Sequence, residues 1–333
     1  MEEENGKRQR NNKSNLKYAA VSSLLCVAII LGGLFSGGAL YNVIAAEEDA
    51  VRYEPETAPS VEEAVSSGEG GETPPSGPVD TDGNEMPSYP EIEQETEVIE
   101  TREYDGETFR VVCIGNSVTQ HPYMSQFEHP DGYWLQDWGM AASAREKDYA
   151  HLLEAKMGEI YGETSLEVYN YMQWEVAEQA GIPRSAYLTY LDPLFEGEKG
   201  PDTDLVIIQL GESCTMYNSL LQDYADLIDY VRTHAPNAVI GVTGTVIIMD
   251  EARNAAVDTI KQMVCQDRGV PYISMSGYNE SMWVGEGTVI YNEQGEATVI
   301  SLIQRTHPGD IGMQYIADQI FQILSPYLPT VSG

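Results

Sequence analysis

Two residues that lie far apart in the sequence have the side chains of a nucleophile and its base. Ser117 follows an apolar run, in the segment FRVVCIGNSVT of residues 109–119. His307 precedes an amphipathic segment, in THPGDIGMQYIADQI of residues 306–320. A serine hydroxyl is a poor nucleophile until an adjacent base takes its proton, and histidine can be that base. The two residues therefore predict a Ser-His hydrolase, if the fold brings them together.

The elements that must position this pair are those of an α/β sheet. Five apolar segments have the length of buried strands: 109–115, 166–171, 204–210, 238–247 and 270–275. Segments with helical periodicity lie at about 144–161, 217–234, 251–268 and 309–325. This alternation indicates βαβ units and a parallel sheet that is covered on both faces. We therefore predict a three-layer α/β/α sandwich with a five-stranded, mostly parallel, flavodoxin-like sheet. Ligands bind in such sheets outside the carboxyl ends of the strands.

Two smaller features belong to the same domain, which we place at residues 108–333. Ser143-x-x-Glu146 predicts a capping box at the start of the first helix. Residues 288–300, around Gln294-Gly295, predict an inserted hairpin.

At this point the chain resembles the SGNH (GDSL-like) hydrolase family over most of residues 108–327. Gly115-Asn116-Ser117 is similar to that family's nucleophile block, and Gln209-Leu210-Gly211-Glu212-Ser213 stands where the family has Gly-x-Asn. His307-Pro308 with Gly312 resembles the family's block before the last helix. The resemblance implies that Ser117 attacks an ester carbonyl and that His307 is the general base. It implies no cofactor and no metal.

The sequence departs from this family at the residue that orients the histidine. The family's aspartate lies three residues before the histidine, and here Gln304 occupies that position. An aspartate fixes the imidazole tautomer and stabilises the imidazolium in the transition state. Two alternatives remain for this chain: the amide oxygen of Gln304 accepts the Nδ1–H bond, or a backbone carbonyl does so. Asp310 lies inside the last helix, on the wrong side of His307.

A second departure concerns the oxyanion hole, whose donors stabilise the charge that develops on the carbonyl oxygen. Ser213 stands where the family has an asparagine, close after Gly211. A serine hydroxyl can donate, but it has a shorter reach than an asparagine amide. Asn116 or Asn170 is an alternative donor, and we expect the backbone N–H of Ser117 to contribute in every case.

The long loop at 121–140 is rich in aromatic residues. Tyr133, Trp134 and Trp138 are predicted to line the substrate site together with Trp174, which follows the second strand. Aromatic faces over a cleft suit stacking on sugar rings or an apolar acyl pocket. The alternative is that the loop packs its own aromatic side chains as a small core. His121 and His129 in this loop lack the helical spacing of metal ligands.

The amino-terminal third of the chain predicts a membrane anchor and a stalk. Residues 1–17 form a basic flank, and an apolar stretch of about 22 residues within 18–46 is long enough to span a bilayer. This pattern predicts a cytoplasmic amino terminus and an extracytoplasmic domain. The alternative is a signal peptide cleaved near Val43-Ile44-Ala45, which would release a secreted protein. Residues 47–107 hold 20 acidic and two basic residues and predict a disordered acidic stalk.

The net charge and the cysteine spacing limit which binding partners and which disulfide bonds we expect. The formal net charge is −35 at pH 7 without a basic cluster in the domain, so a nucleic acid is not an expected partner. Cys113, Cys214 and Cys265 lack a CxxC spacing and are expected to be free buried thiols, although a Cys113–Cys214 bridge is conceivable. The leading hypothesis is a membrane-anchored esterase that acts on O-acyl, acetyl-type, groups of a glycan or a small molecule. The alternative is a catalytically attenuated, glycan-binding surface protein of the same fold.

Overall fold

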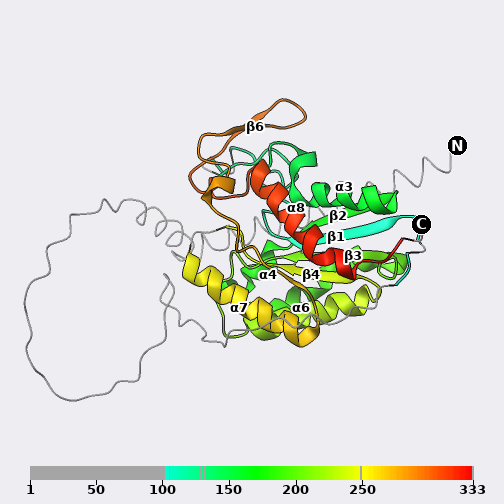
Figure 1. Cartoon of the computed structure of the whole chain (residues 1–333). Helices are drawn as coiled ribbons and strands as arrows, with labels where there is room; N and C mark the ends of the chain where they lie inside the picture. Colours follow the sequence, from blue (N-terminus) through cyan, green and yellow to red (C-terminus); the bar gives the residue numbers. More distant parts are fainter. Residues whose placement is uncertain (1–101, 105, 128, 131, 248–249, 332–333) are drawn as a thin grey trace, which may run out of the picture. The chain divides into compact units, whose positions relative to one another are not determined.

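A computed structural model of the chain describes residues 102–104, 106–127, 129–130, 132–247 and 250–331. At its centre lies a five-stranded sheet in the order β2-β1-β3-β4-β5 (Figure 1). The strands are β1 (Phe109–Gly115), β2 (Thr164–Asn170), β3 (Thr203–Gln209), β4 (Val239–Thr243) and β5 (Tyr272–Ile273). All four strand pairs are parallel. The predicted fold class is therefore confirmed, with the flavodoxin-like strand order.

Four long helices cover the two faces of the sheet. They are α3 (Tyr149–Tyr161), α6 (Leu220–His234), α7 (Glu251–Arg268) and α8 (Asp310–Leu324). Helices α3 and α8 pack on one face, and α6 and α7 on the other (Figure 1). Successive side chains of a strand point to opposite faces, so a strand between two helical layers must be apolar throughout. Strand β3 meets this requirement, because each of its seven residues is buried.

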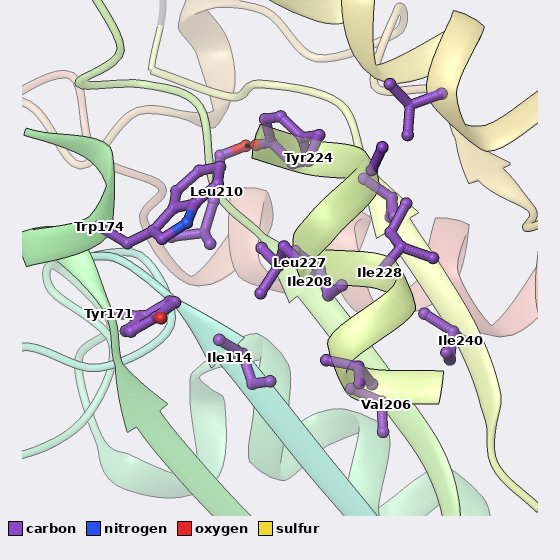
Figure 2. Close-up of a cluster of buried hydrophobic side chains, with 14 of the residues drawn as sticks. Ile114, Tyr171, Trp174, Val206, Ile208, Leu210, Tyr224, Leu227, Ile228 and Ile240 are labelled. Atoms are coloured by element: carbon purple, nitrogen blue, oxygen red, sulfur yellow. Dashed lines mark hydrogen bonds between the residues drawn. The ribbon is translucent and has the colours of Figure 1, made fainter. Parts of the chain in front are cut away.

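The alternation of side chains divides the core into two clusters. Val111 and Cys113 of β1 belong to the cluster under α3 and α8, whereas Val112 and Ile114 belong to the cluster under α6 and α7. Figure 2 shows the second cluster, in which Ile114 of β1 lies near the side chains of β3 and α6. Full burial of each such aliphatic side chain contributes about 1.5–3 kcal/mol, and this fixes the sheet that carries the site.

Shorter elements connect the layers. The short helices are α4 (Met172–Glu175) and α5 (Asp192–Phe195), and the antiparallel hairpin consists of β6 (Val289–Tyr291) and β7 (Ala297–Val299). Segments of 3₁₀ helix lie at Arg145–Lys147, Ala177–Ala180, Arg184–Leu191, Gly197–Lys199, Glu280–Met282 and Ser325–Tyr327. The predicted hairpin at 288–300 is confirmed.

The predicted capping box at Ser143-x-x-Glu146 is wrong. Helix α3 begins only at Tyr149, and its N-cap is Asp148, whose side chain accepts from the backbone N–H of His151. Ser143 instead donates its backbone N–H and its hydroxyl to Asp310 at the start of α8. The carboxylate of Asp310, far along the chain, therefore binds the serine that the local pattern predicted to cap the first helix.

The thiols of Cys113, Cys214 and Cys265 are buried and free, so the conceivable Cys113–Cys214 bridge is absent. The predicted anchor at 18–46 and nearly all of the predicted stalk lie outside the described residues. Among the helices of the described ranges, none is long and apolar enough to cross a membrane.

Candidate functional site

Ser117 lies in the turn that follows β1, at the carboxyl edge of the sheet. The turn is fixed by the Asn116 side chain, whose Oδ1 accepts from the N–H of Val118 at 3.0 Å. The backbone carbonyl of Ser117 accepts from the N–H of Met140 at 2.8 Å. Gly115 precedes the turn, where a Cβ would collide with the Thr119 side chain and the Gln209 carbonyl. This close approach of the turn to β3 explains the glycine in the nucleophile block.

His307 is held from both sides by backbone hydrogen bonds just before α8. Its N–H donates to the Gln304 carbonyl, and its own carbonyl accepts from the N–H of Val284 at 3.0 Å. Trp283 and Pro308 form a backbone bridge beside it. The segment 282–285 therefore fixes the histidine from a distant part of the sequence, and no local motif in the sequence marks it.

The two predicted reacting side chains are in direct contact. The distance between Ser117 Oγ and His307 Nε2 is 2.9 Å, and His307 Nδ1 lies 3.0 Å from the backbone carbonyl oxygen of Gln304. A carbonyl oxygen can only accept, so Nδ1 must carry the hydrogen. The Nε2 lone pair then faces the Ser117 hydroxyl, which donates to it. This tautomer is the one that a general base requires.

The electrostatic surroundings keep His307 neutral. Its side chain is largely buried, and loss of solvent lowers its pKa to about 4. His121 contributes to this lowered pKa, whereas the hydrogen bond to the Gln304 carbonyl opposes the shift. His307 is therefore unprotonated, and able to accept a proton, over most of the pH range.

The side chain of Gln304 does not orient the histidine. Its Oε1 accepts from the N–H and the hydroxyl of Ser301, each at 3.0 Å, and its Nε2 donates to the Tyr133 carbonyl at 3.0 Å. Of the two alternatives that the sequence left open, the structure therefore shows the backbone carbonyl. The amide instead connects the loop that contains Ser301 with the loop that contains Tyr133, both near His307.

Several predicted oxyanion donors are already engaged with acceptors of the protein. Asn116 Nδ2 donates to Glu175 and Glu212, and the N–H of Gly211 donates to Glu175. Asn170 Nδ2 donates to the Gln120 carbonyl. The N–H of Gly211 and both hydrogens of Asn116 Nδ2 are therefore directed at carboxylates and act as structural donors here. Asn170 Nδ2 has a second hydrogen, so its role as an oxyanion donor stays a prediction.

Two donors of the predicted oxyanion site remain free. Within the described residues, neither the backbone N–H of Ser117 nor the hydroxyl of Ser213 has a hydrogen-bond partner. Ser213 is half-buried in the loop after β3. Both donors are therefore available to a bound acceptor, and their role in an oxyanion hole stays a prediction.

The tryptophans predicted to line a substrate site are part of the core. Trp134 and Trp174 are 0% exposed and Trp138 is 3% exposed. The rings of Trp134 and Trp138 meet edge to face at 6.4 Å, and Trp174 packs against Tyr171 and Tyr224 (Figure 2). A buried face cannot stack on a sugar, so the alternative of a self-packed loop is correct for Trp134 and Trp138. Trp174 belongs to the other core cluster, under α6 and α7. Tyr133 is half-buried, and its hydroxyl accepts from the N–H of Val299.

Other residues around the site did not stand out in the sequence. Glu175 is fully buried and accepts a hydrogen bond from the residue before the nucleophile, Asn116. Exposed apolar side chains gather instead in the 121–140 loop, on the hairpin and before His307: Tyr123, Phe127, Val289, Tyr291, Val299, Leu302 and Ile303. Alternation in β6 and β7 could have identified the exposed hairpin face, but nothing local identifies Glu175.

A cavity of the described structure lies away from Ser117 and His307. This cavity of about 660 Å³ opens at the opposite, amino-terminal edge of the sheet, beside Thr108, Ser165 and Asp202. Its basic side chains are already paired with carboxylates, for example Arg110 with Glu167. Within the described residues, no group of three or more His, Cys, Asp or Glu side chains could hold a metal ion.

The chain was also compared with known proteins. No protein-family model and no curated protein sequence matches it. Among solved structures, it is similar to a two-domain esterase active on acetylated mannans, with 17% identity and a TM-score of 0.40 over 66% of this chain. The match spans 50% of that esterase.

Two further solved structures are similar along nearly their whole length. A family 3 carbohydrate esterase of Clostridium thermocellum has 14% identity and a TM-score of 0.41, over 66% of this chain and 96% of that one. An extracellular lipase of Streptomyces rimosus has 15% identity and a TM-score of 0.38, over 65% and 99% of the respective chains.

Proposed function

We propose that the protein is a serine ester hydrolase in which Ser117 is the nucleophile and His307 the general base. The observation that carries this proposal is the 2.9 Å contact between Ser117 Oγ and His307 Nε2, with the imidazole tautomer set by the Gln304 carbonyl. Buried serine and histidine side chains with a purely structural role do not need this tautomer. A nucleophile and its base need both the contact and the tautomer.

The chemistry follows from these positions. His307 Nε2 takes the hydroxyl proton as Ser117 Oγ attacks the ester carbonyl, and the N–H of Ser117 stabilises the oxyanion. The imidazolium then gives its proton to the leaving alcohol, and an acyl-enzyme remains. Water, activated by the same histidine, attacks the acyl-enzyme and restores Ser117.

The orienting group limits the expected rate. A carbonyl oxygen carries only a partial charge, so it stabilises the imidazolium less than a carboxylate does. Loss of the carboxylate charge from such a triad lowers turnover by about 10⁴-fold in the best-studied case, where the tautomer is also lost. Here the tautomer is kept, so the expected penalty is smaller. We therefore expect an esterase that is slower than one with an aspartate in this position.

For the substrate we propose an acetyl-type O-acyl ester, carried by a glycan or a small molecule outside the cytoplasm. The strongly acidic chain disfavours polyanionic substrates. The alternative function, glycan binding without catalysis, lacks the exposed tryptophan faces that it would use, because Trp134, Trp138 and Trp174 are buried.

The test is ester hydrolysis by the full-length protein, measured with an aryl acetate and with acetylated mannan. Ser117→Ala and His307→Ala should each lower kcat by at least about 10³-fold while the fold persists. Ser281→Ala is the matched control, since this exposed serine lies in a short turn and, within the described residues, its side chain hydrogen-bonds only to Asn279. Equal activity of wild type and Ser117→Ala, or an inactive wild type, would refute the proposed function.

A further inference from the structure

Two carboxylates converge on the residue that precedes the nucleophile. Asn116 Nδ2 lies 3.1 Å from Glu175 Oε1 and 2.6 Å from Glu212 Oε2. Glu175 Oε1 also accepts from the N–H of Gly211. Glu175 ends α4, and Glu212 lies in the loop after β3. The pair therefore joins the loops that follow β1, β2 and β3 directly behind Ser117.

The two carboxylates differ in the hydrogen bonds that their oxygens accept. Glu212 Oε1 accepts from Gln209 Nε2 at 2.8 Å and from the N–H of Val246 at 3.0 Å. Glu175 is 0% exposed, and its Oε2 has no hydrogen-bond partner within the described structure. A buried carboxylate oxygen without a donor is costly when it is charged, but a protonated carboxyl carries its hydrogen on such an oxygen.

Few positive charges face the pair. Lys261 of α7 is the nearest, but it already donates to the Leu210 carbonyl at 2.9 Å and pairs with Asp258 at 3.1 Å. Arg184 reaches only the backbone carbonyl of Glu175 and is paired with Asp223 and Glu178. The other titratable groups near Glu175, Cys214 and Tyr224, are buried and neutral.

A buried and a half-buried carboxylate that share one donor group cannot both ionise at low cost. Burial, followed by the charge of Glu212, raises the pKa of Glu175 to about 7, against the opposing effects of Gly211, Asn116 and Lys261. Burial also raises the pKa of Glu212. The pair therefore keeps one proton up to about neutral pH. Glu175 Oε2 can carry it without the loss of an N–H donor, because this oxygen accepts no hydrogen bond within the described structure.

We propose that Glu175 is a positioning residue: its protonated form holds Asn116 and Gly211 in place behind Ser117, and its ionisation lowers ester hydrolysis. This inference rests on the proposed function. When Glu175 loses its proton, two negative charges flank Asn116. Their field opposes the oxyanion that forms at the neighbouring N–H of Ser117.

The pH dependence of hydrolysis follows from two groups with opposite effects. Hydrolysis requires neutral His307, whose pKa is about 4, and neutral Glu175, whose pKa is about 7. The value of kcat/KM should therefore be largest between pH 4 and 7. If only the protonated form is active, kcat/KM should fall by about tenfold per pH unit above that range.

The experiment compares full-length wild type with Glu175→Gln on an aryl acetate from pH 4 to 9. The Gln amide has the shape of the protonated carboxyl, and its Oε1 can accept from Asn116 and Gly211 at every pH. Glu175→Gln should therefore abolish the decline above pH 7. Glu178→Gln is the matched control, because it removes a nearby carboxylate that binds Arg184 and Ser219 but not Asn116. Its profile should be that of the wild type.

A second measurement does not depend on catalysis. A group whose pKa is raised by folding stabilises the folded protein fully at a pH below the group's pKa in the unfolded chain. This stabilisation is lost as pH rises through the group's pKa in the folded protein. The denaturation midpoint, followed by tryptophan fluorescence, should therefore fall between pH 4.5 and 7 in the wild type. The part of this fall that Glu175 contributes should be absent in Glu175→Gln.

The outcomes separate this inference from the proposed function. If the wild type shows Ser117-dependent hydrolysis but the Glu175→Gln profile still declines above pH 7, the positioning role alone is overturned. A wild type without hydrolysis would overturn the proposed function and the positioning role together. Restored activity at pH 8 to 9 in Glu175→Gln, alongside a declining Glu178→Gln profile, would support the inference.

Discussion

At the scale of single residues, Gln304 shows what a sequence position can and cannot specify. The motif order predicts that the group orienting His307 comes from three residues upstream, and the structure places it there. However, the group is the backbone carbonyl, because the Gln304 side chain is bound to Ser301 and the Tyr133 carbonyl. Glu175 was missed as a partner of Asn116 for a related reason. That contact joins residues 59 positions apart and leaves no local periodicity.

The first prediction concerns the substitution that would restore the family's aspartate. Gln304→Asp should not accelerate the enzyme, because position 304 directs its side chain away from the imidazole. The shorter aspartate cannot reach both Ser301 and Tyr133, and it has no N–H to donate to the Tyr133 carbonyl. The loss of about 1 kcal/mol of loop stabilisation should lower kcat by about fivefold. A rise in kcat would show that the new carboxylate reaches His307 Nδ1.

The second prediction concerns the acid limb of the pH–rate profile. Burial lowers the pKa of His307 to about 4, so the histidine is neutral and competent as a base above that value. The value of kcat/KM should rise as pH increases through about 4 and should not rise further near 6.5. His121→Asn should shift this limb slightly to higher pH, since His121 is one cause of the lowered pKa of His307. A limb centred near 6.5 in the wild type would contradict the buried, neutral state of His307.

At the scale of elements, the sheet was largely predictable and the rim was not. Segment 109–115 coincides with β1 and segment 251–268 with α7, because hydrophobic periodicity is local information. The aromatic loop was harder, since alternating polar and aromatic residues suit both a ligand site and a small core. Its burial depends on the hairpin, which supplies a distant buried partner. The backbone N–H of Leu135 donates to Thr298 Oγ1, and that hydroxyl donates to Gln136 Oε1 at 3.0 Å.

The third prediction tests this contact between the loop and the hairpin. Thr298 is fully buried, so Thr298→Val keeps the shape but leaves the Leu135 N–H and the Gln136 side chain without their partner. The expected cost is about 1–3 kcal/mol, which lowers Tm by roughly 2–10 °C in a domain of this size. Val299→Thr is the control, because its side chain lies on the exposed face of the same strand. An unchanged Tm in Thr298→Val would mean that the hairpin contributes nothing to folding of the loop.

At the scale of the whole molecule, the two ends of the described domain lie side by side. The N–H of Tyr104 donates to the Thr330 carbonyl, and the N–H of Thr330 donates to the Arg102 carbonyl. Arg102 also lines the cavity at the amino-terminal edge of the sheet. The chain therefore enters its domain at the edge opposite Ser117. A tether attached at this point leaves the carboxyl edge, with Ser117 and His307, unobstructed by the attachment.

The last prediction follows from this arrangement and from the amino-terminal sequence. An uncleaved anchor within 18–46 would place residues 47–333 outside the cell. The acidic segment 47–107 would then connect this anchor to the domain at 108–333. Protease added to intact cells should then cut within 47–107 and release a fragment that retains Ser117-dependent hydrolysis, since the site lies at the far edge of the sheet. Ser117→Ala cells, treated in the same way, should release an inactive fragment of equal size. Full-length protein that resists protease in intact cells would contradict the orientation, and active protein in the medium without protease would indicate signal cleavage instead.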